Sequence, residues 1–277
     1  MSKTGIAETG FVEVEGGRLY YEAAGTGQAL VLVHAGVADC RMWDEQFSAF
    51  AQSYRVIRYD ARGFGKTASE DVSFSNRQDI VDLLRHLGIE RTAILGLSRG
   101  GQIAIDFTLE HPEMVTALIA VAAGLSGYEG PATEAERRLF AEYERLEAEK
   151  DYNALTEFEV RIWGDGPGQP AGRADTPVRE RLREMIANNY RLHHEEVQPR
   201  VLKPPAVDRL GEIHAPTLVL WGDLDFSDVG AAMSLLAERV SGAQQAVFPG
   251  VAHMVNMEQP ERFNQVVVDF LSKLGAW

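Results

Sequence analysis

The 277-residue chain carries 27 Lys and Arg against 41 Asp and Glu, a formal net charge of −14. Such a surface repels phosphate backbones and anionic lipids, which argues against nucleic acid and against a membrane as partner. Apolar residues make up 45% and charged residues 25%, an ordinary globular balance that fits one large domain with an insertion.

The single cysteine, Cys40, excludes an internal disulfide and a cysteine metal cluster. We expect it to be a small, partly buried residue without an activating partner. The N-terminus lacks the apolar stretch of a signal peptide, and no apolar run reaches the roughly 18 residues that span a bilayer. A soluble, cytoplasmic protein is therefore expected.

The first segment predicts a β-hairpin, because "FVEVEGGRLYYEAAG" (11–25) alternates apolar and polar residues around Gly16-Gly17. Six short, almost continuously apolar segments follow, mostly separated by helical patterns: 29–34, 54–60, 92–97, 115–124, 216–222 and 244–250. This alternation predicts an α/β fold with a mostly parallel, eight-stranded sheet and helices on both faces.

Residues 131–211 break the alternation. A capping box at Thr133 opens a helical pattern, a Gly- and Pro-rich loop follows at 163–172, and 178–192 reads as another helix. No convincing strand occurs in this region. The predicted domains are a core of residues 1–130 and 212–277 and an inserted helical cap of residues 131–211.

The stretch "ILGLSRGG" (94–101) places a serine where an apolar strand ends and a helix begins. Gly96-Leu97-Ser98-Arg99-Gly100 matches G-x-S-x-G, the nucleophile elbow, in the expected strand–turn–helix context. The glycines have a physical reason, since a Cβ beside so tight a turn would clash. The pattern predicts Ser98 as a nucleophile, against the simpler reading of a serine that caps a turn.

A serine nucleophile needs a base, and a base needs an acid to orient it. His253, in the loop after the last predicted strand, lies at the edge where the other strand-end loops gather. The alternative is a loop histidine that only hydrogen-bonds backbone. For the acid, Asp225 is preferred over Asp223, and Asp228 is expected to cap the following helix.

An oxyanion hole needs two backbone N–H groups. We expect one from Arg99, directly after the serine, and one from Gly36 in the loop "HAGV" (34–37), with Val37 as the alternative. His34 is expected to hold this loop in a structural role.

Four motifs in order resemble those of the α/β-hydrolase superfamily, and the resemblance covers the whole chain. Besides the elbow, they are "VLVHAGVADCRMW", "YDARGFGKT" and "GVAHMVNMEQPERF". The resemblance implies that Gly36 supplies an oxyanion amide, that Gly222-Asp223-Leu224-Asp225 carries the acid at Asp225, and that 131–211 is a cap. The chain departs from the family at Ala35, where a His-Gly pair is usual.

Other residues have simpler expected roles. Asp60 and Arg62 are expected to form a pair that stabilises a turn. Four side chains are candidates for an apolar acyl pocket, although cap packing is an equal explanation for the first two: Trp163, Tyr190, Phe226 and Met254.

These features predict a serine hydrolase that cleaves small carboxylic esters or lactones through an acyl-enzyme, with no cofactor and no metal. The chain looks closest to small esterases and to lactonases related to enol-lactone hydrolases. The alternatives with the same triad are a perhydrolase, an acyltransferase or a C–C bond hydrolase. A rival of another class is a ligand-binding protein of this fold with little turnover.

Overall fold

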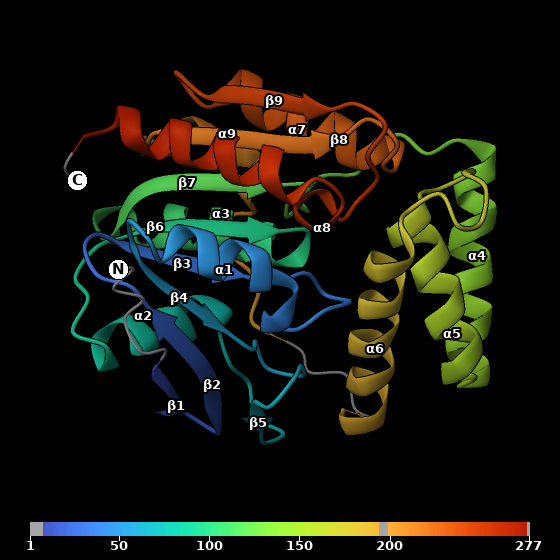
Figure 1. Cartoon of the computed structure of the whole chain (residues 1–277), viewed down its shortest axis with the longest axis horizontal. Helices are drawn as coiled ribbons and strands as arrows, with labels where there is room; N and C mark the ends of the chain where they lie inside the picture. Colours follow the sequence, from blue (N-terminus) through green and yellow to red (C-terminus); the bar gives the residue numbers. More distant parts are fainter. Residues whose placement is uncertain (1–7, 194–198, 276–277) are drawn as a thin grey trace.

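The computed structural model describes residues 8–193 and 199–275 (Figure 1). Its strands are β1 (Glu8–Val14), β2 (Gly17–Ala24), β3 (Ala29–Val33), β4 (Arg55–Tyr59), β5 (Ala68–Ser69), β6 (Thr92–Leu97), β7 (Val115–Val121), β8 (Thr217–Gly222) and β9 (Gln244–Phe248). Its α-helices are α1 (Asp44–Phe50), α2 (Asn76–His86), α3 (Arg99–Glu110), α4 (Glu134–Glu149), α5 (Tyr152–Glu159), α6 (Thr176–Leu192), α7 (Ser227–Arg239), α8 (Val255–Glu258) and α9 (Pro260–Lys273).

One sheet holds all these strands, in the order β1-β2-β4-β3-β6-β7-β8-β9, with the two-residue β5 beside β2. The β1–β2 and β2–β4 pairs are antiparallel, and every pair from β4 to β9 is parallel. The predicted mostly parallel sheet is therefore confirmed. Only β5 was not anticipated, because two residues carry no periodicity.

Helices cover both faces of the sheet, and each face has its own apolar layer. The layer that contains Ile80, Phe107 and Met233 joins α2, α3 and α7 to the sheet. The layer that contains Phe50 and Phe263 joins α1 and α9 to the opposite face. The central strands β3, β6 and β7 are buried along their whole length, which explains why their sequences are apolar without alternation.

Between β7 and β8 lie α4, α5, a π-helical turn (Val160–Asp165) and α6, here called the insertion helices. They stand together beyond one end of the sheet, at the right of Figure 1. The predicted capping box is present, because Thr133 accepts the Glu136 N–H while the Glu136 carboxylate accepts that of Thr133. Helix α6 matches the helix predicted at 178–192, and α5 was not predicted as a separate helix.

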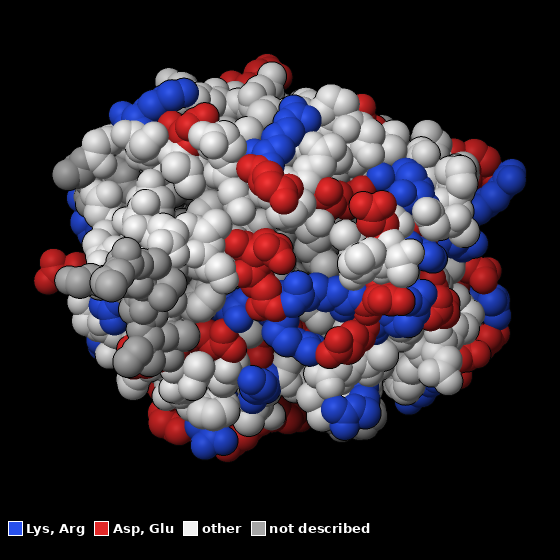
Figure 2. Space-filling view, viewed as in Figure 1, with Lys and Arg blue, Asp and Glu red and all other residues white. Residues whose placement is uncertain are grey.

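The insertion helices meet loops that follow the strands' carboxyl ends. Asn189 of α6 accepts the Gly65 N–H at 3.1 Å and donates to the Ala38 carbonyl at 3.1 Å. Arg41 pairs with Glu184 of α6 at 2.6 Å. Figure 2 shows cations and carboxylates interleaved across the middle of this face, where α1 and α6 face each other, so that neither sign dominates there. Among the helices in the described residues, none is long and apolar enough to cross a membrane.

Candidate active site

Ser98 sits at the tight turn between β6 and α3. Its backbone has φ 58° and ψ −119°, a conformation that a residue with a side chain rarely adopts. A Cβ on Gly96 would lie 2.1 Å from the Gly100 carbonyl oxygen, and a Cβ on Gly100 would lie 2.2 Å from the Val33 carbonyl oxygen. Both positions therefore require glycine. Strain of this kind persists where the surrounding structure enforces it, as it often does at functional sites.

The structure joins two of the predicted residues directly. Asp225, three residues after β8, lies 2.7 Å through its Oδ2 from His253 Nδ1. Both side chains are almost fully buried. A buried carboxylate on Nδ1 fixes that nitrogen as the N–H donor and leaves Nε2 free to accept a proton. Within the described residues, no hydrogen bond joins Ser98 to His253. Hydrogen bonds between catalytic residues are often long or poorly aligned until the substrate binds.

The neighbouring acids have other partners. Asp223 accepts the Gly250 N–H through Oδ1 at 2.6 Å, so it holds the turn before the histidine loop. The prediction that Asp228 caps α7 was wrong. Residue Phe226 occupies the N-cap position with no side-chain cap, and Asp228 lies inside the first turn, because the helix begins two residues earlier than expected.

The two predicted oxyanion residues lie side by side. A Cβ on Gly36 would be 3.3 Å from Arg99 Cδ, so the arginine stem crosses the loop at the one residue without a side chain. Arg99 is the first residue of α3, where backbone N–H groups have no acceptor within the helix. The Ala35 side chain is buried in an apolar layer of the core. Its extra methyl is thus accommodated within the core.

His34 ties this loop to the next one, as expected. Its Nε2 accepts the Ala61 N–H at 2.9 Å, and its Nδ1 lies 2.8 Å from the Ala35 carbonyl, which makes Nδ1 the protonated nitrogen. Burial lowers the pKa of His34 and favours this neutral form.

The expected pairing of Asp60 with Arg62 was wrong. Arg62 is buried and forms a bidentate salt bridge with Asp79 of α2, with both N–O distances 2.8 Å. Asp60 instead accepts the N–H groups of Cys40 and Lys66, each at 2.8 Å. The two side chains point in different directions from the turn, so each binds a partner in another part of the fold.

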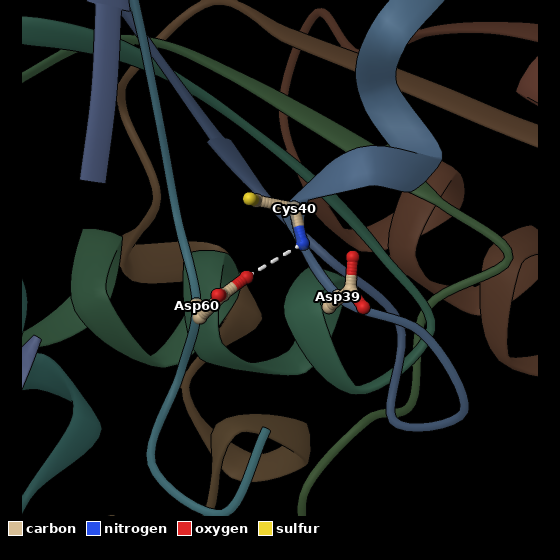
Figure 3. Close-up of side chains that lie close together, drawn as sticks. All are labelled: Asp39, Cys40 and Asp60. Carbon is tan, nitrogen blue, oxygen red and sulfur yellow. Dashed lines mark hydrogen bonds between the residues drawn. The ribbon is translucent and has the colours of Figure 1, made fainter. Parts of the chain in front are cut away.

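Asp39, Cys40 and Asp60 form the cluster in Figure 3, with potential metal ligands within 4.8 Å of one another. The carboxylates already have partners, since Asp39 binds Arg41 at 2.8 Å and Asp60 holds two backbone amides. Cys40 is 2% exposed, more buried than expected, and burial raises the pKa of its thiol well above the usual value. The cluster therefore has the character of a structural support.

The insertion helices contact the histidine directly. The Trp163 ring lies 4.6 Å from that of His253. Nearby, Arg173 donates to the Gly250 carbonyl at 2.9 Å and pairs with Glu258 at 2.6 Å. Glu258 in turn accepts the Ala252 N–H at 2.8 Å, one residue before His253. One arginine thus connects the insertion to both sides of the histidine loop.

A cavity of about 400 Å³ opens between the elbow and the insertion helices. Ser98 is not among its lining residues, but Gly36 and Arg99 are. The Arg99 guanidinium lies over the Phe64 ring at 5.1 Å. The other lining residues are Val37, Gly63, Tyr143, Glu147, Lys150, Tyr152, Leu155, Glu159, Ile186, Asn189, Tyr190 and His193.

Of the four acyl-pocket candidates, Tyr190 lines this cavity, whereas Met254 is fully buried in the core and Phe226 packs between Phe140 and Trp163. Sequence reasoning missed Glu159 and the Arg173–Glu258 pair. Neither has a motif, because a buried carboxyl and a bridging arginine look like any helical glutamate and any loop arginine until the chain is folded.

Comparison with known proteins shows the family and the fold. The model of the alpha/beta hydrolase family matches residues 30–266. A 2-hydroxy-6-oxo-6-phenylhexa-2,4-dienoate hydrolase of Burkholderia cepacia is 30% identical over 273 residues, covering 92% of this chain and 91% of that protein. A 2-hydroxy-6-oxononadienedioate/2-hydroxy-6-oxononatrienedioate hydrolase of Paraburkholderia phymatum is 30% identical with 99% of each chain covered.

Two solved structures add esterase and lactonase neighbours. A thermophilic esterase from Thermogutta terrifontis is similar with a TM-score of 0.72 and 25% identity, covering 96% of this chain and 99% of that one. The enol-lactonase from Burkholderia xenovorans has a TM-score of 0.74 at 20% identity, covering 95% and 100%, and shows the shared fold. The chain belongs to the alpha/beta hydrolase family and is a hydrolase.

Proposed function

We propose that this hydrolase cleaves small carboxylic esters or lactones, with Ser98 as nucleophile, His253 as base and Asp225 as the orienting acid. The observation that carries the proposal is the buried 2.7 Å contact between Asp225 and His253. The strained serine at the elbow supports the same site. Ester cleavage requires nothing beyond these groups and two oxyanion donors, which are the amides of Gly36 and Arg99.

The reaction follows from these roles. Ser98 Oγ attacks the carbonyl carbon while its proton passes to His253 Nε2, and the negative oxygen is held by the two amides. The tetrahedral adduct then collapses as His253 gives that proton to the leaving alkoxide. Water, deprotonated by His253, attacks the acyl-enzyme in the same way and releases the acid. Asp225 stabilises the imidazolium in both halves of the reaction.

A second candidate is C–C bond hydrolysis with the same residues. Its support is the names of the relatives in Burkholderia cepacia and Paraburkholderia phymatum, which are hydrolases of 2-hydroxy-6-oxo-dienoates. A cation, Arg99, also lines the cavity and offers a counter-charge for a carboxylate. In this reaction the leaving group is a carbon that must be protonated, so the demand on proton delivery is greater than for an alkoxide.

One experiment compares these functions. Acid release from a butyrate ester and from a γ-lactone is followed in a pH-stat, and 2-hydroxy-6-oxo-6-phenylhexa-2,4-dienoate is followed by loss of its absorbance. We expect the ester or lactone to be turned over fastest, and Ser98→Ala to lose about 10⁶-fold in kcat. The control is Ser234→Ala, an exposed serine of α7. Preference for the dienoate by more than tenfold favours the second candidate, and inertness toward all three substrates overturns both.

A further inference from the structure

Glu159, at the end of α5, is a buried carboxyl in the wall of the cavity. Glu159 is 4% exposed and lines the cavity together with Tyr152 and Tyr190. The Tyr190 hydroxyl donates to Glu159 Oε2 at 3.1 Å. Within residues 8–193 and 199–275, no cation pairs with this carboxyl and no donor reaches Oε1. Glu159 Oε2 therefore accepts a hydrogen bond from Tyr190, and Oε1 is available to accept one from a ligand.

Burial of an unpaired carboxyl is costly, so its retention needs a reason. Burial, opposed by the Tyr190 hydrogen bond, raises the pKa of Glu159 to about 7. Tyr190 is itself fixed, because its ring stacks on that of Tyr152 with centroids 5.1 Å apart. The tyrosine thus orients the carboxyl within the cavity. A purely structural bond to Tyr190 needs only one of the two oxygens.

We propose that Glu159, oriented by Tyr190, is a specificity-determining residue that accepts a hydrogen bond from a donor at the end of the substrate remote from the scissile carbonyl. This rests on the proposed hydrolysis at Ser98. The cavity connects the two ends, since Gly36 and Arg99 line it beside the nucleophile and Glu159 lines it on the insertion side. The substrate class is thus a small ester or lactone that carries a distal hydroxyl or ammonium group.

Burial of Glu159, together with the charges around it, sets the pH at which this recognition is strongest. Its own helix supplies no other charge to the cavity lining, and Glu147 of α4 raises its pKa further by repulsion. The titratable and charged groups that share the cavity are Tyr143, Glu147, Lys150, Tyr152, Tyr190, His193 and Arg99. An ionised carboxylate is the stronger acceptor, so preference for a donor-bearing substrate increases as pH rises through about 7.

The test uses matched p-nitrophenyl esters of six- and eight-carbon acids, each ending in a methyl or a hydroxyl group. In the wild-type protein at pH 8, we expect kcat/KM for at least one hydroxyl-ended ester to exceed that of its methyl-ended partner by about tenfold, corresponding to ~1.4 kcal/mol. Glu159→Leu should abolish or invert this ratio. Glu159→Gln should retain part of it and remove its pH dependence. The matched control is Glu157→Gln on the same helix, whose exposed carboxylate pairs with Arg183, and it should leave the ratio unchanged.

Substrate ratios respond to recognition and not to general loss of stability, which affects both esters equally. A wild-type ratio near one at both chain lengths, or a ratio unchanged in Glu159→Leu, overturns the inference. If Glu159→Leu does not fold, Tyr190→Phe replaces it and should lower the ratio by releasing the carboxyl.

Binding separates this inference from the proposed function. The same ester pairs are titrated calorimetrically into Ser98→Ala, with and without Glu159→Leu. Tighter binding of a hydroxyl-ended ester that depends on Glu159, with no turnover in the wild type, sinks the hydrolysis proposal and leaves the recognition site intact. Turnover by the wild type, with equal binding of the two esters whether or not Glu159 is replaced, supports the hydrolysis proposal and overturns the recognition site.

Discussion

The strand-end loops and the insertion helices are held in place by different forces. Around the loops, at the ends of the strands and helices that they join, backbone approaches backbone so closely that glycine alone fits. Examples are Gly96, Gly100 and Gly222, where an added Cβ would lie within 2.2 Å of a carbonyl oxygen. The insertion helices are joined to the core through side chains, including Arg41 to Glu184 and Arg173 to Glu258. The proposed chemistry thus rests on the part of the fold fixed by backbone packing, while the proposed selection of the substrate rests on a part that side-chain changes can adjust.

Among the variants that compare the two regions, the largest expected effect belongs to the strand-end loops. Asp225→Asn should lower kcat by about 10³- to 10⁴-fold, because an amide cannot hold His253 in the tautomer that accepts a proton and cannot stabilise the imidazolium. Asp223→Asn is the matched control. It retains an oxygen for the Gly250 N–H and should keep most of the activity. The measurement is kcat of both variants on the ester that the wild type cleaves fastest. An equal loss in the two variants would contradict the assignment of Asp225 as the acid.

The next effect is on stability and belongs to the insertion helices. Because the native pKa of Glu159 is about 7 against 4.5 for the free side chain, the native state holds a proton that the unfolded chain releases between these pH values. The contribution of Glu159 to stability therefore falls as pH rises from about 4.5 to 7, by an amount on the order of 3 kcal/mol.

Glu159→Gln removes this titration, so its stability relative to the wild type should increase between pH 5 and pH 8. Urea unfolding at the two pH values measures the difference. Glu157→Gln provides a contrast, since Arg183 holds the pKa of Glu157 below its ordinary value of 4.5. Glu157 is therefore ionised throughout this range, and the stability of Glu157→Gln relative to the wild type should not change between pH 5 and pH 8. A constant gap between wild type and Glu159→Gln would show that the carboxyl is not perturbed in the native state.

A smaller effect is expected where the two regions meet. Arg173→Ala removes the bonds to Gly250 and Glu258 and also those to the Gly164 and Asp165 carbonyls beside Trp163. We expect kcat to fall by about tenfold with little change in KM, because the histidine loop loses its brace while the cavity keeps its lining. Arg173→Lys should recover part of the rate.

A double-mutant cycle with Glu258→Gln tests whether this brace acts as a unit. The two changes should be less than additive in kcat, because each alone breaks the same pair. Additive losses would mean that Arg173 acts through the Gly250 carbonyl and its own loop.

The smallest effect is expected at the exposed contact between the regions. Glu184 is 68% exposed, and its pair with Arg41 is screened by solvent. Glu184→Ala should change the free energy of unfolding by no more than ~0.5 kcal/mol and leave kcat/KM unchanged. A clear loss of activity would show that the insertion helices depend on surface pairs for their position, and would weaken the contrast between the two regions.

Much of the fold was predictable because its causes are local. Short apolar runs separated by helical patterns indicate a parallel sheet, and every predicted strand is present within a few residues. The elbow was readable because a tight turn demands glycine at known spacing. Asp225 was preferred over Asp223 by its place in the pattern, and it does lie against His253.

Side-chain partners were less predictable, because they depend on which segments the fold brings together. Arg62 is bonded to Asp79 of α2 and not to its neighbour in the turn. Trp163 contacts a histidine 90 positions further along the chain, through a π-helical turn that has no sequence signature. Glu159 looked like any helical glutamate, and only its burial in the cavity sets it apart.

The sequence by itself therefore determined the class of fold and the order of the candidate nucleophile, acid and base, because hydrophobic periodicity and glycine sterics act over a few residues. Tertiary structure alone decided which carboxyl meets which partner and how the insertion contacts the histidine loop. Those outcomes depend on packing between distant segments, where burial and distance set the energy of each pair.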